Sequence, residues 1–343
     1  WRSFFKIAFP MALPALITGI SLMCMEVMNE LGTFALLNIP SISTGIAENW
    51  IIEGNPKSAI GLSLVALLII FTLIIFEKFS RRKSKRWSEN PASKDSQGWE
   101  LNKTRAFLAI IISLFPPIFS FGIPCFWVLL NIDLIQKGLS IELLSLSLRT
   151  ISLGLLTALI AMLFSLIISL ARRPNKSLLL GLITNLAGIG YAIPGTVLAL
   201  SLISISSSKF NFIAICLLIW GYLVRFLTIS KGSIDSSLER ISPSLDEAAL
   251  GLGENWLGII KRIHLPLLQG PIFVGSLLVF VDTIKELPIT FILRPFDFDT
   301  LSVRIYQYAG DERMVEAILP AILIMTLGLI ASITLIPSLE KKN

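Results

Sequence analysis

The stretch RIHLPLLQGPIFVGSLLVFVDTIKELPITFIL, Arg262 to Leu293, begins with polar residues and continues into a long apolar run. A helix needs about twenty mainly apolar residues to cross roughly 30 Å of hydrocarbon. The part from 271 to 293 has that length, although Asp282 and Glu286 lie inside it. The stretch therefore predicts a membrane-spanning helix that carries charge within the bilayer.

The composition of the whole chain agrees with a membrane protein. Of its 343 residues, 54% are hydrophobic and 15% are charged, whereas soluble domains carry about 25% charged residues. The net charge of +6 does not indicate nucleic-acid binding, because the basic residues are spread between apolar runs and not clustered as a nucleic-acid-binding face requires. We therefore predict an all-α integral membrane protein with about eight transmembrane helices. The expected spans are 10–37, 58–76, 106–131, 145–170, 178–205, 211–229, 271–293 and 315–337.

Lysine and arginine between the spans predict the orientation, because cytoplasmic loops carry an excess of both. The eight crossings alternate without conflict and place both ends of the chain in the cytoplasm. The segments expected on the cytoplasmic side are 77–86, 171–177, 230–270 and 340–342. Those expected on the other side are 38–57, 132–143, 206–210 and 294–314.

An internal repeat runs through the chain. A shift of 256 positions aligns Lys6–Leu37 with Arg262–Leu293 without a gap. Apolar matches between spans arise easily, whereas acidic matches inside them do not. The polar matches are Glu26 with Asp282, Glu30 with Glu286, and Thr44 with Thr300.

The repeat predicts two related units. Residues 1–86 form the C-terminal remnant of the first unit, with two spans, and 105–343 form a complete second unit with six. A polar, serine-rich cytoplasmic linker at 87–104 joins them. On this interpretation roughly 150 residues of the first unit precede Trp1 in the native protein.

The polar segment between the fourth and fifth spans of the second unit, at 230–270, predicts a short helix. In ISPSLDEAALGL, Ser242 or Ser244 can cap the helix and Pro243 suits its first turn. Gly253 can adopt the positive φ that ends one helix and redirects the chain. The apolar side chains that share one face are Leu245, Ala248, Ala249 and Leu252.

Two uses of this helix can be weighed. It can lie on lipid headgroups, or it can dock into a groove of a soluble partner. Helices on anionic lipid usually carry lysine or arginine on their polar face, whereas this one carries Asp246 and Glu247. Docking to a partner is therefore the preferred interpretation.

The order of residues in this segment resembles the EAA loop of the permease subunits of binding-protein-dependent ABC importers. Trp1–Pro10 resembles the closing half of a second such loop. The resemblance implies the ABC importer permease fold and a cytoplasmic coupling loop that docks on an ATP-binding subunit, of which two copies are expected. The matching positions, expected to carry the coupling role, are Glu247, Ala248, Ala249, Gly253, Ile263, Leu265 and Pro266.

Two further stretches, Gly190–Leu202 and Asp282–Glu312, resemble the second half of the fused two-unit permeases of ferric-iron importers. This resemblance implies a multi-pass protein of the bacterial inner membrane that receives ferric iron from a periplasmic binding protein and works by alternating access. Related fused permeases for thiamine, polyamines or phosphonate share parts of these stretches. An ion-coupled secondary transporter is the alternative from another class, but it would need no docking helix.

The acids inside the spans, Glu26, Glu30, Asp282 and Glu286, have two interpretations. A charge at the bilayer centre costs at least about 2.5–3.5 kcal/mol, so such groups normally face a cavity or a partner. One interpretation is a ring of carboxylates near the pseudo-two-fold axis, along the path of a hard trivalent cation. The other is structural, with Glu286 paired to Lys285 or Arg294 and Asp282 bonded to a neighbouring helix.

Pro194 and Gly195 lie in the middle of an expected span, where a proline removes a helix hydrogen bond and produces a kink. The kink can be a hinge beside a gate, or it can be static and only shape the packing.

The remaining residues predict no catalytic or metal site. His264 is the only histidine, and Cys24, Cys125 and Cys216 lie far apart in apolar runs. A membrane-embedded enzyme would need such groups to be clustered. No segment reads G-x-x-x-x-G-K-[ST], the loop that cradles nucleotide phosphates. We therefore expect no enzyme activity and no cofactor on this chain, with ATP bound by a partner subunit.

Overall fold

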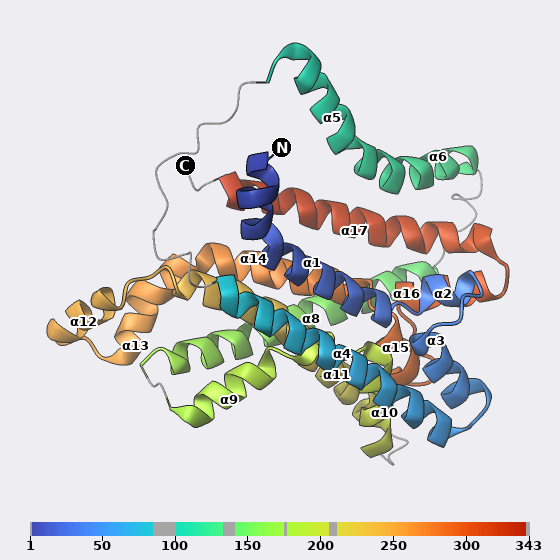
Figure 1. The fold of residues 1–343 in the computed structure, drawn as a ribbon. Coiled ribbons are helices and arrows are strands. Elements are labelled where there is room, and N and C mark those ends of the chain that lie inside the picture. Colours follow the sequence, from blue (N-terminus) through green and yellow to red (C-terminus); the bar gives the residue numbers. More distant parts are fainter. Residues whose placement is uncertain (1, 85–100, 133–140, 175–176, 206–210, 341–343) are drawn as a thin grey trace.

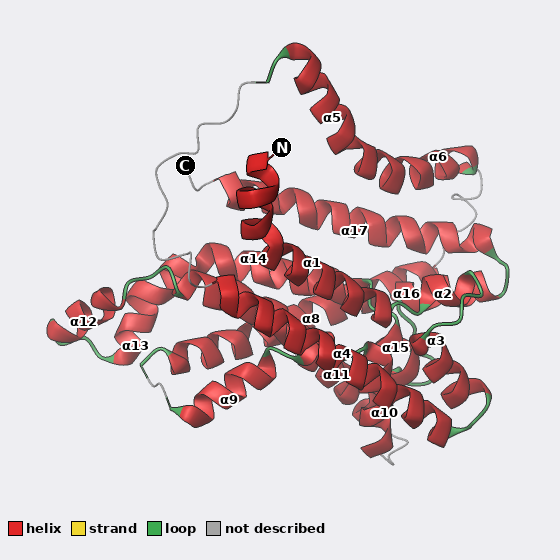
Figure 2. Cartoon of the chain, in the orientation of Figure 1, coloured by secondary structure: helices red, strands yellow, loops and turns green. Residues whose placement is uncertain are grey.

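The structure is a computed structural model that describes residues 2–84, 101–132, 141–174, 177–205 and 211–340, all of them in helices or connecting loops (Figures 1 and 2). The expected linker at 87–104 lies outside this part of the chain, apart from its last four residues. In the labels, η marks a π-helical turn, except for η5, which is a 3₁₀ turn. The helices are η1 (Phe4–Ala8), α1 (Phe9–Asn29), α2 (Gly32–Leu36), α3 (Ile42–Ala47), η2 (Glu48–Ile52), α4 (Pro56–Ser84), α5 (Lys103–Pro117), η4 (Ile118–Gly122), α6 (Ile123–Leu130), α8 (Ile141–Arg172), α9 (Leu178–Ala187), η5 (Gly190–Ala192), α10 (Gly195–Ile205), α11 (Asn211–Leu238), α12 (Pro243–Gly251), α13 (Trp256–Ile259), η6 (Ile260–His264), α14 (Leu265–Ile284), α15 (Pro288–Leu293), α16 (Leu301–Gly310) and α17 (Met314–Glu340).

The centre of the molecule is a bundle of α8, α11 and α14, which pack against one another along their lengths. Leu153, Leu218 and Val279, one from each of these helices, are buried in a common apolar cluster. Small residues allow the close approach. A side chain on Gly154 would lie within about 3 Å of Phe280 and Ile284 of α14. The helix α1 packs on α4, and Glu26 near its C-terminal end lies 3.5 Å from Arg225 of α11.

The repeat predicted from the sequence is present in the backbone. The π-helical turn η1 and helix α1 begin at residues 4 and 9, and η6 and α14 begin at 260 and 265, so both pairs are offset by 256 positions. The short helices α2 and α15 follow at the same offset, and the residues before them share a backbone conformation, with φ −112° at Leu31 and −111° at Leu287.

Beyond these short helices, the sequence alignment slips. The next helix begins at a capping Ser41 in the first repeat and at a capping Thr300 in the second, and each side chain accepts the backbone N–H three residues on. Ser41, and not Thr44, is therefore the structural counterpart of Thr300. Thr44 instead closes a reciprocal capping box with Ser41.

Six helices in the described part of the chain are long and apolar enough to cross a membrane, or seven if one sharply bent pair counts as a single span. The one expected span that remains, 10–37, corresponds to α1. The structure does not describe the α1 side chains at positions 14, 15 and 18. The span Lys103–Leu130 has no buried residue in its most apolar part and runs apart from the bundle in Figure 1.

Two expected boundaries were wrong in the same way. The spans predicted to reach residues 37 and 293 end at Asn29 and Ile284, and the chain then turns into α2 and α15. At the other end, the helix that contains α14 begins at Trp256 and not at 271. The apolar runs did not show these ends, because the short helices that follow are as apolar as the spans.

The expected kink at Pro194 is a complete break. The helical segments 178–192 and 195–205 meet at an angle of 113°. Ile193 between them is extended, with ψ 101°, the conformation that a following proline favours. This span is therefore broken or re-entrant, and not a kinked continuous helix.

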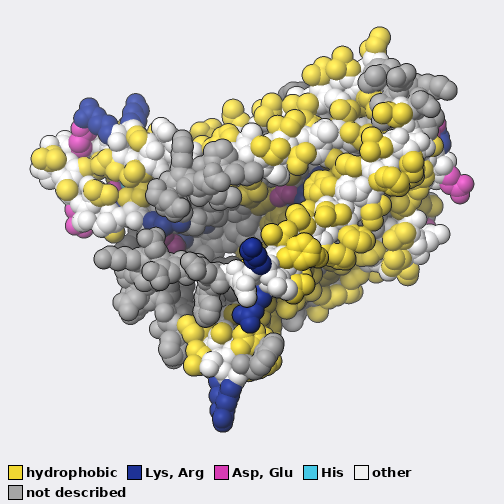
Figure 3. Space-filling view, turned by 90° about the horizontal axis from the view of Figure 1, so that it is seen from above, with side chains coloured by type: hydrophobic (Ala, Val, Ile, Leu, Met, Phe, Trp, Pro, Cys, Tyr) yellow, Lys and Arg dark blue, Asp and Glu magenta, His cyan; other side chains and the backbone are white. Residues whose placement is uncertain are grey.

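Several described helix ends that were predicted to share one side of the membrane lie at the same end of the molecule. In Figure 1 the C-terminal ends of α4 and α17 lie at the left with α12, while α2, α3 and α16 lie at the right. In Figure 3 hydrophobic side chains spread over much of the visible face, and many of the lysines and arginines in view lie on the left lobe and at the lower edge. Which of these ends faces the cytoplasm remains a prediction.

Candidate functional site

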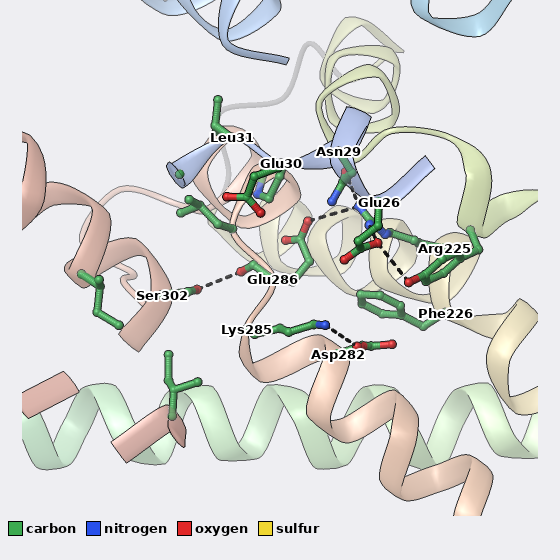
Figure 4. A pocket seen from close by; sticks show the side chains of 16 residues that line it. Glu26, Asn29, Glu30, Leu31, Arg225, Phe226, Asp282, Lys285, Glu286 and Ser302 are labelled. Atoms are coloured by element: carbon green, nitrogen blue, oxygen red, sulfur yellow. Dashed lines mark hydrogen bonds and ion pairs between the residues drawn. The ribbon is translucent and has the colours of Figure 1, made fainter. Parts of the chain in front are cut away.

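A cavity of about 300 Å³ lies where α1 and α14 end against α11 (Figure 4). All four acids that the sequence places inside spans line it, namely Glu26, Glu30, Asp282 and Glu286. The two repeats therefore contribute equivalent carboxylates to one space. Whether an ion passes along these carboxylates remains a prediction.

The breaks after α1 and α14 position two of the acids. Glu30 accepts a hydrogen bond from the backbone N–H of Thr33 through Oε1 at 2.9 Å, and Glu286 accepts the equivalent bond from Ile289 at 3.0 Å. Exposed N–H groups and the helix dipole at a helix start both favour a carboxylate. These two acids therefore stabilise the starts of α2 and α15.

Arg225 of α11 is the residue that the sequence analysis missed. It is 2% exposed and lies between the repeats, with Nη2 3.5 Å from Glu26 and Nη1 3.8 Å from Glu286. It also donates to the side chain of Asn29. In Figure 4 Glu26 and Glu286 point toward this guanidinium. An arginine within the expected span 211–229 was the signal that could have found it, since charges inside spans mark functional or paired sites.

The partners expected for the acids on structural grounds were wrong for Glu286. Lys285 pairs instead with Asp282, at 2.9 Å, and Arg294 pairs with Asp299. The side chain of Glu286 instead reaches forward over the first turn of α15, where it accepts hydrogen bonds from the backbone N–H groups of Ile289 and Thr290. Its buried cation comes from α11, a separate helix.

The side chains of Arg225, Asn29 and Glu286 leave no room for a side chain at Gly195. A Cβ there would lie 2.9 Å from Nη1 of Arg225 and 3.0 Å from both Oδ1 of Asn29 and Oε1 of Glu286. Its N–H donates to Oδ1 of Asn29 at 2.6 Å, so the start of α10 points into the charged cluster. The break at Pro194 therefore places the start of α10 against Arg225, Asn29 and Glu286. Its role as a hinge stays a prediction.

The charges that line the cavity do not cancel. Four carboxylates face two cations, Arg225 and Lys285, which leaves an excess of two negative charges. Glu26 also accepts a hydrogen bond from the hydroxyl of Tyr191 at 3.0 Å. Among the described residues no group of three or more His, Cys, Asp or Glu is arranged to hold a metal ion.

The second candidate site is α12, the helix predicted from the polar segment. It begins at Pro243 with Ser242 as the N-cap, and Gly253 has φ +86° just after its end. Both local predictions are confirmed. In Figure 1, α12 and α13 project beyond the rest of the bundle at one end of the molecule.

The exposed surface of α12 and the following turn is rich in large apolar side chains. Leu252 is 87% exposed and Leu257 is 67% exposed, and Leu245 and Leu250 are also exposed. Glu247 and Ala248 face outward as well, whereas Ala249 is buried. Isolated exposed leucines are common, but several on one projecting tip indicate an interaction surface.

Asp246 was expected on the outer polar face with Glu247, and this was wrong. Its side chain is turned inward, 2.5 Å from Nε of Arg173 and 3.2 Å from Nε2 of His264. The last three positions of the sequence motif are helical and do not lie in a loop. Ile263 is in η6, and Leu265 and Pro266 begin α14.

Comparisons with known proteins agree with the resemblance inferred from the motifs. No protein-family model matches the chain. The Fe(3+)-transport system permease protein FbpB 2 of Haemophilus influenzae is 26% identical over 318 residues, which cover 90% of this chain and 62% of that protein. The chain thus spans about three-fifths of the length of the relative it matches. The described part of the chain is all-α and contains helices long enough to cross a membrane. Over nine-tenths of its length the chain resembles a permease of the ferric-iron type of ABC importer.

Proposed function

We propose that this chain forms the transmembrane pathway of an ABC importer for ferric iron in a bacterial inner membrane. A separate ATP-binding subunit, in two copies, hydrolyses ATP, and a periplasmic binding protein delivers the ion. The chain itself is a transport subunit and not an enzyme. Closure of the ATP-binding subunits acts through α12 on the cytoplasmic side and switches the access of the cavity from one side of the membrane to the other.

The observation that carries this proposal is the pairing of two features in one chain. One is a projecting helix with unpartnered leucines, which suits docking into a groove of another protein. The other is a charged cavity between two repeats, a common place for the substrate path of a transporter. The coupling role of Glu247, Ala248, Ala249 and Gly253 follows from the first feature, together with the resemblance of this segment to the EAA loop.

Ferric iron as the substrate is supported by the relative's printed name and by the sign of the cavity charge. The excess of two negative charges favours a cation and disfavours a phosphonate. Thiamine and polyamines are also cations, so the charge alone does not select among them.

The test is ATP-dependent uptake into proteoliposomes that contain the complex purified from native membranes, with its binding protein supplied outside. The proposal expects uptake of radiolabelled ferric iron that requires ATP and is not reduced by an excess of thiamine or spermidine. Uptake driven by a proton or sodium gradient without ATP would instead show a secondary transporter.

A further inference from the structure

Arg173, just beyond the C-terminal end of α8, connects three separate parts of the chain. Its Nη1 donates to the backbone carbonyl of Leu238, the last residue of α11, at 2.9 Å. Its Nη2 donates to the carbonyls of Ile241 at 2.9 Å and Ser242 at 3.3 Å, in the turn that leads to α12. The last carbonyls of a helix lack partners within the helix, so this guanidinium also caps α11.

The same guanidinium holds α12 itself. Nε of Arg173 donates to Oδ2 of Asp246 at 2.5 Å, and both side chains are largely buried, at 13% and 11% exposure. On its other side, Oδ1 of Asp246 lies 3.2 Å from Nε2 of His264, which is fully buried against Trp256. His264 is in η6, the turn that continues into α14. Asp246 therefore contacts the start of α14 as well as Arg173 at the end of α8.

The helices that meet at this point are also tied to one another nearby. Ser169 of α8 donates to Asp235 of α11 at 2.5 Å, and Ser233 of α11 donates to the carbonyl of Pro271 in α14 at 2.8 Å. A displacement of α12 at Asp246 therefore acts on three connected helices together. A planar guanidinium with five fixed donors suits such a junction better than a lysine, which offers a point charge.

We propose that Arg173, Asp246 and His264 form the joint that transmits movement of α12 to α8, α11 and α14, with Arg173 as its positioning residue. This inference rests on the proposed coupling role of α12. The leucines and Glu247 on the outer surface of α12 contact the partner, whereas the joint lies on its inner surface and touches no partner. Loss of the joint therefore leaves docking intact and uncouples the movement.

The first test needs no partner. Hydrogen exchange of the purified chain in detergent is compared between Arg173→Gln and the exposed neighbour Arg172→Gln. Loss of charged hydrogen bonds should speed exchange across residues 239–255 by about tenfold or more in Arg173→Gln, with no change in Arg172→Gln. Unchanged exchange in Arg173→Gln overturns the joint. If that variant does not accumulate, Asp246→Asn, which removes the acceptor charge, is measured in its place.

The second test uses the complex with its ATP-binding subunit. The joint predicts normal association and ATP hydrolysis in Arg173→Gln, with about fivefold or more ATP consumed per ion taken up. Arg173→Lys should not restore the ratio. A parallel fall of hydrolysis and uptake, in proportion to lost complex, would show a merely structural role and overturn the proposal. If the wild-type complex shows no ATP-driven uptake, the proposed function fails, and the exchange result alone decides the joint.

Discussion

Glu30 and Glu286 hold equivalent positions in the two repeats and make the same hydrogen bond, each to the backbone N–H three residues further along the chain. Their surroundings differ. Glu286 is 5% exposed and 3.8 Å from the buried Arg225, whereas Glu30 is partly exposed and has no arginine beside it among the described residues. The two repeats therefore share a backbone arrangement, but we expect the two carboxylates to contribute differently to the free energy of unfolding.

This difference predicts unequal effects of the same substitution. Glu286→Ala leaves a buried guanidinium short of a partner and should lower the free energy of unfolding by about 3–5 kcal/mol. Glu30→Ala loses one hydrogen bond at a helix start and should cost about 0.5–2 kcal/mol. Unfolding of the purified chain in mixed micelles with increasing SDS measures both. Equal losses would contradict the assignment of Arg225 as the partner of Glu286.

Gly195 should tolerate no side chain. Gly195→Ala forces its Cβ against Arg225, Asn29 and Glu286, and overpacking of this kind costs about 1–3 kcal/mol. Gly181→Ala, in the other half of the broken span, meets nothing within 4 Å and serves as the control. We expect a lower unfolding midpoint and reduced uptake only for Gly195→Ala. A wild-type midpoint for that variant would refute the packing at this position.

The apolar tip of α12 should be needed for docking. Leu252→Asp places a charge on an 87% exposed leucine of the tip and should weaken association with the ATP-binding subunit about tenfold or more. Phe296→Asp, at a 93% exposed site between α15 and α16, is the matched control at the other end. Association is measured by titration of the purified subunits. Loss of binding in both variants, or in neither, counts against docking at α12.

The cavity carboxylates should matter for transport and not only for folding. Glu30→Gln combined with Glu286→Gln removes the excess of two negative charges while keeping one acceptor oxygen in each side chain. Because a charged cleft raises the local cation concentration, we expect iron uptake to fall about tenfold or more. Uptake unchanged from wild type in a correctly assembled complex rejects the cation path.

Local rules explain much of what the sequence could predict. Ser242, Pro243 and Gly253 define the ends of α12 through a cap, a first-turn proline and a positive φ. The offset of 256 positions is also found between the helices of the two repeats. The sequence could predict it because acidic residues inside spans match only rarely by chance. The ends of α1 and α14 were missed, since neither Glu30 nor Glu286 interrupts the apolar pattern enough to show that the helix stops there.

The partners of the buried charges could not be predicted in the same way. Arg225 and Glu26 are 199 positions apart, and Arg225 lies outside both repeats, so no periodicity relates them. Asp246 looked like a solvated residue beside Glu247, and only the position of Arg173, 73 residues earlier, turns it inward. Such pairings depend on how the helices pack, which short-range pattern does not specify.

The central claim, that α12 is the contact through which an ATP-binding subunit moves these helices, is tested most directly by cross-linking. A cysteine replaces Glu247 in a chain whose Cys24, Cys125 and Cys216 are changed to serine, and native membranes are treated with a short bismaleimide. The account predicts a product that joins this chain to a subunit with a nucleotide-binding loop, and none for a cysteine at Phe296. A cysteine at 247 that is labelled only from the outer face of the membrane, with no such product, would contradict it.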